Sequence, residues 1–122
     1  MTTSERAITN MPEREQSISE QFRVVAKQWV DADAAASLME ELKTTSLEKM
    51  KQRIIDEEGP MADNRAERQA KCDPEWEKYL RGMCNHRATA NRLKVQLEYL
   101  RMKFNEWQSM EASVRAEMRL SK

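Results

Sequence analysis

Residues 76–118, which read WEKYLRGMCNHRATANRLKVQLEYLRMKFNEWQSMEASVRAEM, decide the fold of this chain. Apolar side chains recur there at alternating intervals of three and four residues, and only His86 and Glu111 interrupt the series. An unbroken repeat of this length is typical of a coiled-coil helix, because it keeps one apolar seam along one side. The pattern therefore predicts a long helix over about 74–120.

The first half of the chain predicts a second long helix, over about 18–58. Ser17 and Glu20 form a capping box, in which each side chain satisfies a backbone amide at a helix start. A three-four repeat of apolar residues runs from Phe22 to Met39 and then rotates around the helix. Gly59-Pro60 predicts the end, because glycine accepts a left-handed conformation and proline cannot continue the hydrogen-bond ladder.

The remaining segments predict a tail and a connection. Residues 1–16 are polar and without period, so they are expected to be flexible. Residues 59–73 connect the helices, as a short helix or an open segment with a sharp turn. Asp73-Pro74-Glu75 predicts the start of the second long helix, since Asp caps, Pro suits the first turn and Glu complements the helix dipole.

The composition supports an all-α fold. The 122 residues include 34 % charged residues but only 2 Gly and 3 Pro, which is unlike a β-sandwich, a collagen or a disulfide scaffold. No stretch is long and apolar enough for a membrane span. The N-terminal residues have no apolar core, so we expect no signal peptide. Cys72 and Cys84 are too far apart on one helix to form a disulfide, so we expect reduced thiols in a cytoplasmic protein.

Two long helices joined in this way are expected to pair as an antiparallel hairpin, within a single domain over residues 17–122. Our expected register brings Trp29 to Trp107 and packs Phe104 against Ala32 and Ala36, so that a large residue meets small ones. The flanking charges expected to face one another are Asp33 with Arg101 and Glu40 with Lys94.

The hairpin is expected to dimerise into a four-helix arrangement, because two helices alone bury little surface and many apolar residues lie off the seam. The nine methionines suit adaptable helix contacts or simply fill a core. The seam or interface residues that we predict are Phe22, Val25, Trp29, Ala32, Ala36, Met39, Met83, Leu93, Leu97, Leu100, Phe104, Trp107 and Val114.

The sequence indicates no enzyme. Its single histidine, His86, lies on the helical seam, where a structural role is the common one, and no nucleotide-binding, HExxH or EF-hand motif is present. Cys84 and His86 are two potential metal ligands, fewer than a structural site requires. We therefore predict no catalytic residues, no cofactor and no metal.

Basic residues gather in the middle of the second long helix. Residues 78–103 hold seven basic residues against Glu98 alone, and such a run can follow a phosphate backbone. The candidate nucleic-acid contacts are Lys78, Arg81, Arg87, Arg92, Lys94, Arg101 and Lys103. Against this interpretation, salt bridges to the first helix would neutralise some of them, and the pI near 6.6 is low for a nucleic-acid binder.

Residues 74–118 also resemble a family of small helical proteins of tailed phages and prophages, encoded near single-strand-annealing recombinases and single-strand-binding proteins. The likeness lies in WEKYL at 76–80, ANRLK at 90–94 and the ending FNEWQSMEASVR at 104–115. Trp107, Ser109, Ala112 and Arg115 fit the family's Trp-x-Ser-x-x-Ala-x-x-Arg ending. The resemblance implies a phage setting in the bacterial cytoplasm and a role in DNA recombination or counter-defence.

Together these features predict a non-enzymatic helical adaptor or inhibitor that acts through protein-protein contacts as a homodimer. The partners implied are a recombinase, a single-strand-binding protein or a host nuclease complex, with no membrane. Direct DNA or RNA binding through the basic run is the alternative, and a purely structural coiled coil is a third interpretation.

Overall fold

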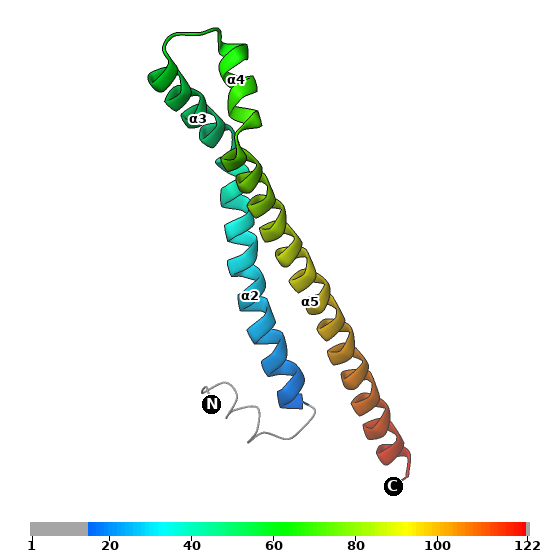
Figure 1. Cartoon of the computed structure of the whole chain (residues 1–122). Helices are drawn as coiled ribbons and strands as arrows, with labels where there is room; N and C mark the ends of the chain where they lie inside the picture. Colours follow the sequence, from blue (N-terminus) through cyan, green and yellow to red (C-terminus); the bar gives the residue numbers. More distant parts are fainter. Residues whose placement is uncertain (1–14, 122) are drawn as a thin grey trace. The chain divides into compact units, whose positions relative to one another are not determined.

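The computed structural model describes residues 15–121, with side chains from residue 18 onward. Within them the fold is all-α, as predicted: helices make up 93 % of the described residues, and no strand occurs there. The four helices are α2 (Glu15–Glu41), α3 (Lys43–Glu58), α4 (Asp63–Cys72) and α5 (Pro74–Leu120) (Figure 1). The expected flexible tail lies outside the described residues, apart from its last two positions, which begin α2.

A break at Leu42 divides the single helix that we expected over 18–58 into α2 and α3. Leu42 has φ −86° and ψ 0°, outside the helical range, yet its N–H donates to the carbonyl of Leu38 at 3.0 Å. Its own carbonyl accepts from the N–H of Ser46 at 2.8 Å, so the chain bends without a loop. The break occurs where the apolar repeat rotates in the sequence, and it lets each helix present its own apolar side.

The structure shortens the expected 59–73 connection to the residues between α3 and α4. Gly59, at φ +96°, ends α3 and donates its N–H to the carbonyl of Ile55 at 2.8 Å. Helix α4 then packs on α3 through Ala66 and Ala70, which are both fully buried. Two alanines suffice for this contact because small side chains let helix backbones approach closely. This segment has few apolar residues, so the sequence alone was compatible with both a short helix and an open segment.

Helix α5 starts as the sequence predicts. The carboxylate of Asp73 accepts a hydrogen bond from the N–H of Glu75 at 2.8 Å, and Pro74 occupies the first turn. Trp76, two residues after Pro74 and 5 % exposed, stacks on Tyr79 with ring centroids 5.6 Å apart. This aromatic pair anchors the first turns of α5.

The chain divides into two compact units, which we describe separately. One comprises residues 31–90, with the end of α2, all of α3 and α4, and the start of α5. Its buried side chains are small apart from one tryptophan and one lysine: Ala36, Lys51, Ala66, Ala70, Trp76 and Ala90. The described part of the other unit, residues 15–30 and 91–121, buries Val25 and Leu100.

The expected charge register was wrong by two heptads for Asp33 and by one heptad for Glu40. Asp33 and Glu40 both pair with Arg87, instead of with Arg101 and Lys94. The error has a simple cause: a heptad repeat looks the same after a shift of seven residues, so the length of the connection selects the register. With α4 folded as a helix, the reversal of the chain lies at 59–62.

The aromatic residues near the end of α5 follow the same shift. Phe104 lines a hollow with Ser19 and Phe22, and Trp107 lines another with Ile18. Both rings therefore lie against the first turns of α2, and Trp107 is not opposite Trp29 as expected. The two rings also contact each other, with centroids 5.9 Å apart.

Candidate protein-binding face

The side chain of Arg87 links α5 to α2 in the 31–90 unit. Its guanidinium donates to Glu40 at 2.6 and 3.0 Å, to Asp33 at 2.7 Å and to the hydroxyl of Ser37 at 3.3 Å. The hydrogen bond from Arg87 is the main cause that lowers the pKa of Glu40, and the two carboxylates raise the pKa of Arg87 in turn. Arg87 thus has a structural role, and it is the only half-buried member of the predicted basic set.

The other six predicted nucleic-acid contacts are exposed along α5. Arg81 pairs with Glu77 one turn earlier at 2.8 Å. The ammonium of Lys103 lies 5.6 Å from the ring centre of Tyr99, a cation-π distance. The structure therefore keeps a basic surface on α5 but removes Arg87 from it.

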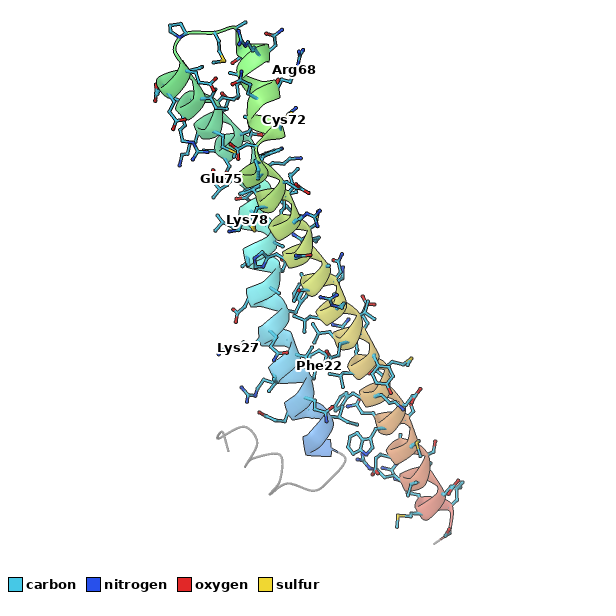
Figure 2. The ribbon with its side chains drawn as sticks, viewed as in Figure 1. Phe22, Lys27, Arg68, Cys72, Glu75 and Lys78 are labelled. Atoms are coloured by element: carbon cyan, nitrogen blue, oxygen red, sulfur yellow. The ribbon has the colours of Figure 1, made fainter. Side chains whose placement is uncertain are left out.

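Most of the predicted seam residues are covered. Val25, Ala36 and Leu100 are buried, while Val114 is 50 % exposed. Phe22 lies on the side of α2 toward α5, whereas the exposed Lys27 lies on its other side (Figure 2). The half-buried seam residues are Phe22, Trp29, Ala32, Met39, Met83, Leu93, Leu97, Phe104 and Trp107. His86, expected on the seam, is exposed, and the neighbouring Arg87 takes the inward position.

The side of α5 opposite the seam carries large apolar side chains that are exposed. Val95 is 65 % exposed, Tyr99 52 %, Met102 51 % and Met110 60 %. Residues three, four and seven apart share one side of a helix, so Val95, Tyr99 and Met102 form a continuous patch. We call this surface, residues 92–110 on the side away from the seam, the α5 outer face.

A shallow groove runs along the α5 outer face. Both charged and apolar side chains line it: Glu98, Arg101, Met102, Asn105, Glu106, Ser109 and Met110. The apolar floor beside charges of both signs is an arrangement that suits a second helix, since such a helix offers alternating apolar and charged positions.

Farther along α5, the seam itself becomes exposed. Val114 and Met118 continue the three-four repeat, yet they are 50 % and 64 % exposed, and Leu120 is 87 % exposed. Within the described residues, the last turns of α5 therefore carry exposed apolar side chains.

No cluster of metal-binding side chains occurs in the described part of the chain, where no group of three or more His, Cys, Asp or Glu comes together. Cys72 and Cys84 are both exposed free thiols. None of the helices described is long and apolar enough to cross a membrane.

Sequence reasoning missed one charged residue that the fold uses. Lys51 is only 5 % exposed, and it pairs with Asp63 at 2.8 Å and Glu48 at 3.1 Å. These hydrogen bonds raise its pKa, with the one to Asp63 contributing most. The signal lay in the spacing, because Leu47, Lys51 and Ile54 follow the rotated apolar repeat of α3.

Comparisons with known proteins found no family model, no curated protein and no solved structure that matches this chain.

Proposed function

We propose that this chain is a non-enzymatic helical protein that acts by binding other proteins through the α5 outer face. The observation that carries the proposal is the row of exposed apolar side chains Val95, Tyr99, Met102 and Met110 on a long regular helix. Clustered apolar exposure of this kind marks protein-binding surfaces, since isolated exposed hydrophobic residues are ordinary but contiguous ones are not.

The arrangement also suits a rigid interaction element. A helix presents its side chains in a fixed pattern, so little order has to be gained on binding. The exposed methionines can adapt to an irregular partner surface. We propose that association completes a four-helix arrangement, in which the outer face of α5 meets a further helix. The proposal assigns no catalytic, cofactor or metal role to any residue.

The biological setting that we propose is a phage-encoded module of DNA recombination or host counter-defence, with a recombinase, a single-strand-binding protein or a nuclease complex as partner. This part of the proposal rests on the sequence resemblance of residues 74–118.

Site-specific photo-crosslinking tests the binding face. A photoreactive phenylalanine analogue replaces Met102 on the α5 outer face in one variant and the exposed Lys27 of α2 in a matched control. Both variants are produced in the cells from which the sequence comes. We expect protein adducts from position 102 and few or none from position 27. Equal adducts at both positions, or none at either, would overturn the proposal.

Direct nucleic-acid binding is a second candidate, favoured by the exposure of basic residues along α5. Arg92 and Lys103 are eleven residues apart, which returns them to nearly the same line of the helix. Tyr99, beside Lys103, offers a ring on which a base can stack. If the chain binds nucleic acid directly, we expect its affinity for a single-stranded oligonucleotide to fall steeply between about 50 and 200 mM salt. An absence of binding at the lower salt concentration would reject it.

A further inference from the structure

We propose that a second copy of this chain packs antiparallel on the α5 outer face, with Glu98 of each copy against Arg101 of the other. This inference rests on the proposed function and specifies the first partner of the same face. It follows from the order of charges and apolar residues between positions 92 and 110.

The apolar centre of the face is compact. Val95 and Met102 are seven residues apart and lie on the same line of the helix, with Tyr99 beside them. All three side chains are more than half exposed. The cation-π contact with Lys103 holds the Tyr99 ring in place. A second helix laid along this line would cover these side chains together.

The charges border this centre on two sides. Glu98 and Arg101 lie along one edge, and both line the groove with Met102. Arg101 also borders the hollow of Phe22 and Phe104 on the side toward α2. Arg92 and Glu106 lie along the other edge, on the line of Tyr99, seven residues before it and seven residues after it. All four side chains are exposed. Each edge thus carries one acid and one base, which is what a self-complementary surface requires.

One register satisfies both edges and the centre together. When two copies run antiparallel about a two-fold axis near Tyr99, Val95 meets Met102 of the second copy. The same register sets Glu98 against Arg101 of the second copy and Arg92 against Glu106 of the second copy. Because the axis is two-fold, every one of these contacts occurs twice.

The neighbouring cations fit this register as well. Lys94 meets Asn105 of the second copy, and Lys103 meets Gln96 of the second copy, so neither faces a like charge. Opposite charges placed together favour association, so the order of charges fits the antiparallel dimer.

Charge reversal with mass measurement tests the register. Light scattering of the purified full chain is expected to give twice 14.3 kDa. Each single variant, Glu98→Arg or Arg101→Glu, places like charges opposite one another at two positions of the dimer. It is expected to raise the dissociation constant by about tenfold or more. The double variant Glu98→Arg/Arg101→Glu restores opposite charges and is expected to return the dissociation constant to within about threefold of the original.

Lys27→Glu, on the side of α2 away from α5, is the matched control and is expected to leave the dimer unchanged (Figure 2). Circular dichroism of each variant checks that it remains helical. A mass of 14.3 kDa at about 100 µM, or a double variant as weak as the single ones, would overturn the inference. If the chain is monomeric while position 102 still crosslinks to a different protein, the second copy is rejected and the proposed function stands.

Discussion

The guanidinium of Arg87 in α5 holds the carboxylate of Glu40 in α2 through two hydrogen bonds, of 3.0 Å from Nε and 2.6 Å from Nη2. This paired geometry is the one in which arginine binds carboxylates most specifically. A third bond to Asp33 extends the contact by two helical turns of α2. The interaction fixes the register between these segments of α2 and α5 within the 31–90 unit.

The stability of the fold is therefore expected to fall in acid partly through Glu40. The hydrogen bond from Arg87 lowers the pKa of Glu40 below its ordinary value of about 4.3. A group with a depressed pKa in the folded state stabilises the fold above its unfolded pKa, and this contribution is lost as the pH falls through the folded pKa.

Melting temperatures between about pH 3 and pH 7 test this dependence. Glu40→Gln is expected to melt lower at neutral pH and to show a smaller loss on acidification than the original chain. Glu41→Gln, at the next position of α2, is the control. If the two variants have the same pH profile, the Arg87 contact does not determine it.

Tyr79 is expected to stabilise the end of α2 through its hydroxyl, which donates a hydrogen bond to the carbonyl of Met39. This carbonyl lies in the last turn of α2, just before the break at Leu42. Tyr79→Phe removes the donor and keeps the ring stacked on Trp76, so it is expected to cost about 1 kcal/mol in urea unfolding. Tyr99→Phe, on an exposed ring, should cost less, and equal losses would contradict the role of the bond.

The two glycines are expected to respond to alanine in opposite directions. Gly59 has φ +96°, so Gly59→Ala should destabilise the chain by about 1–2 kcal/mol through backbone strain, although nothing lies within 4 Å of the new Cβ. Gly82 lies inside α5, where alanine is a better helix former by about 1 kcal/mol. Its new Cβ would lie 3.4 Å from the terminal methyl of the flexible Met39 side chain. Chemical unfolding of both variants checks the signs, and a stabilising Gly59→Ala would contradict this account of the turn.

The α3–α4 contact is expected to depend on the small size of Ala66. This side chain is fully buried, so Ala66→Leu should force the helices apart and cost about 1–3 kcal/mol. Ala88→Leu, at an exposed position of α5, is the matched control. Thermal unfolding followed by circular dichroism compares the stability of the two variants. If Ala66→Leu is as stable as the original chain, the α3–α4 contact is not closely packed at this position.

The sequence was sufficient to predict the helix end at Gly59 and the helix start at Asp73, but not the break at Leu42 or the pairing between the helices. Gly59 and Asp73 act locally, so their roles as helix end and helix start could be predicted from the residues alone. Whether Arg87 or Arg101 meets Asp33 depends on contacts far apart in the chain. The three bases at 87, 94 and 101 are a heptad apart and look equivalent in the sequence, so the fold of the 63–72 segment decides between them.

The candidate face was predictable only in part. The sequence shows that Val95, Met102 and Met110 lie off the seam, and it places Lys103 and Arg101 nearby. Their exposure, and the contact between Lys103 and Tyr99, required three-dimensional positions.

Oxidative footprinting of the methionines tests the central claim, that the α5 outer face is the surface covered by another chain. Met102, Met110 and Met118 are 51 %, 60 % and 64 % exposed in the single chain, so they start from similar accessibility. The oxidation rate of each is measured by mass spectrometry on the purified protein at rising concentration. We predict that Met102 becomes protected as the chain associates while Met118, beyond the proposed dimer contact, continues to oxidise at its original rate. Unchanged oxidation of Met102 in associated chains, or equal protection of Met102 and Met118, would contradict the claim.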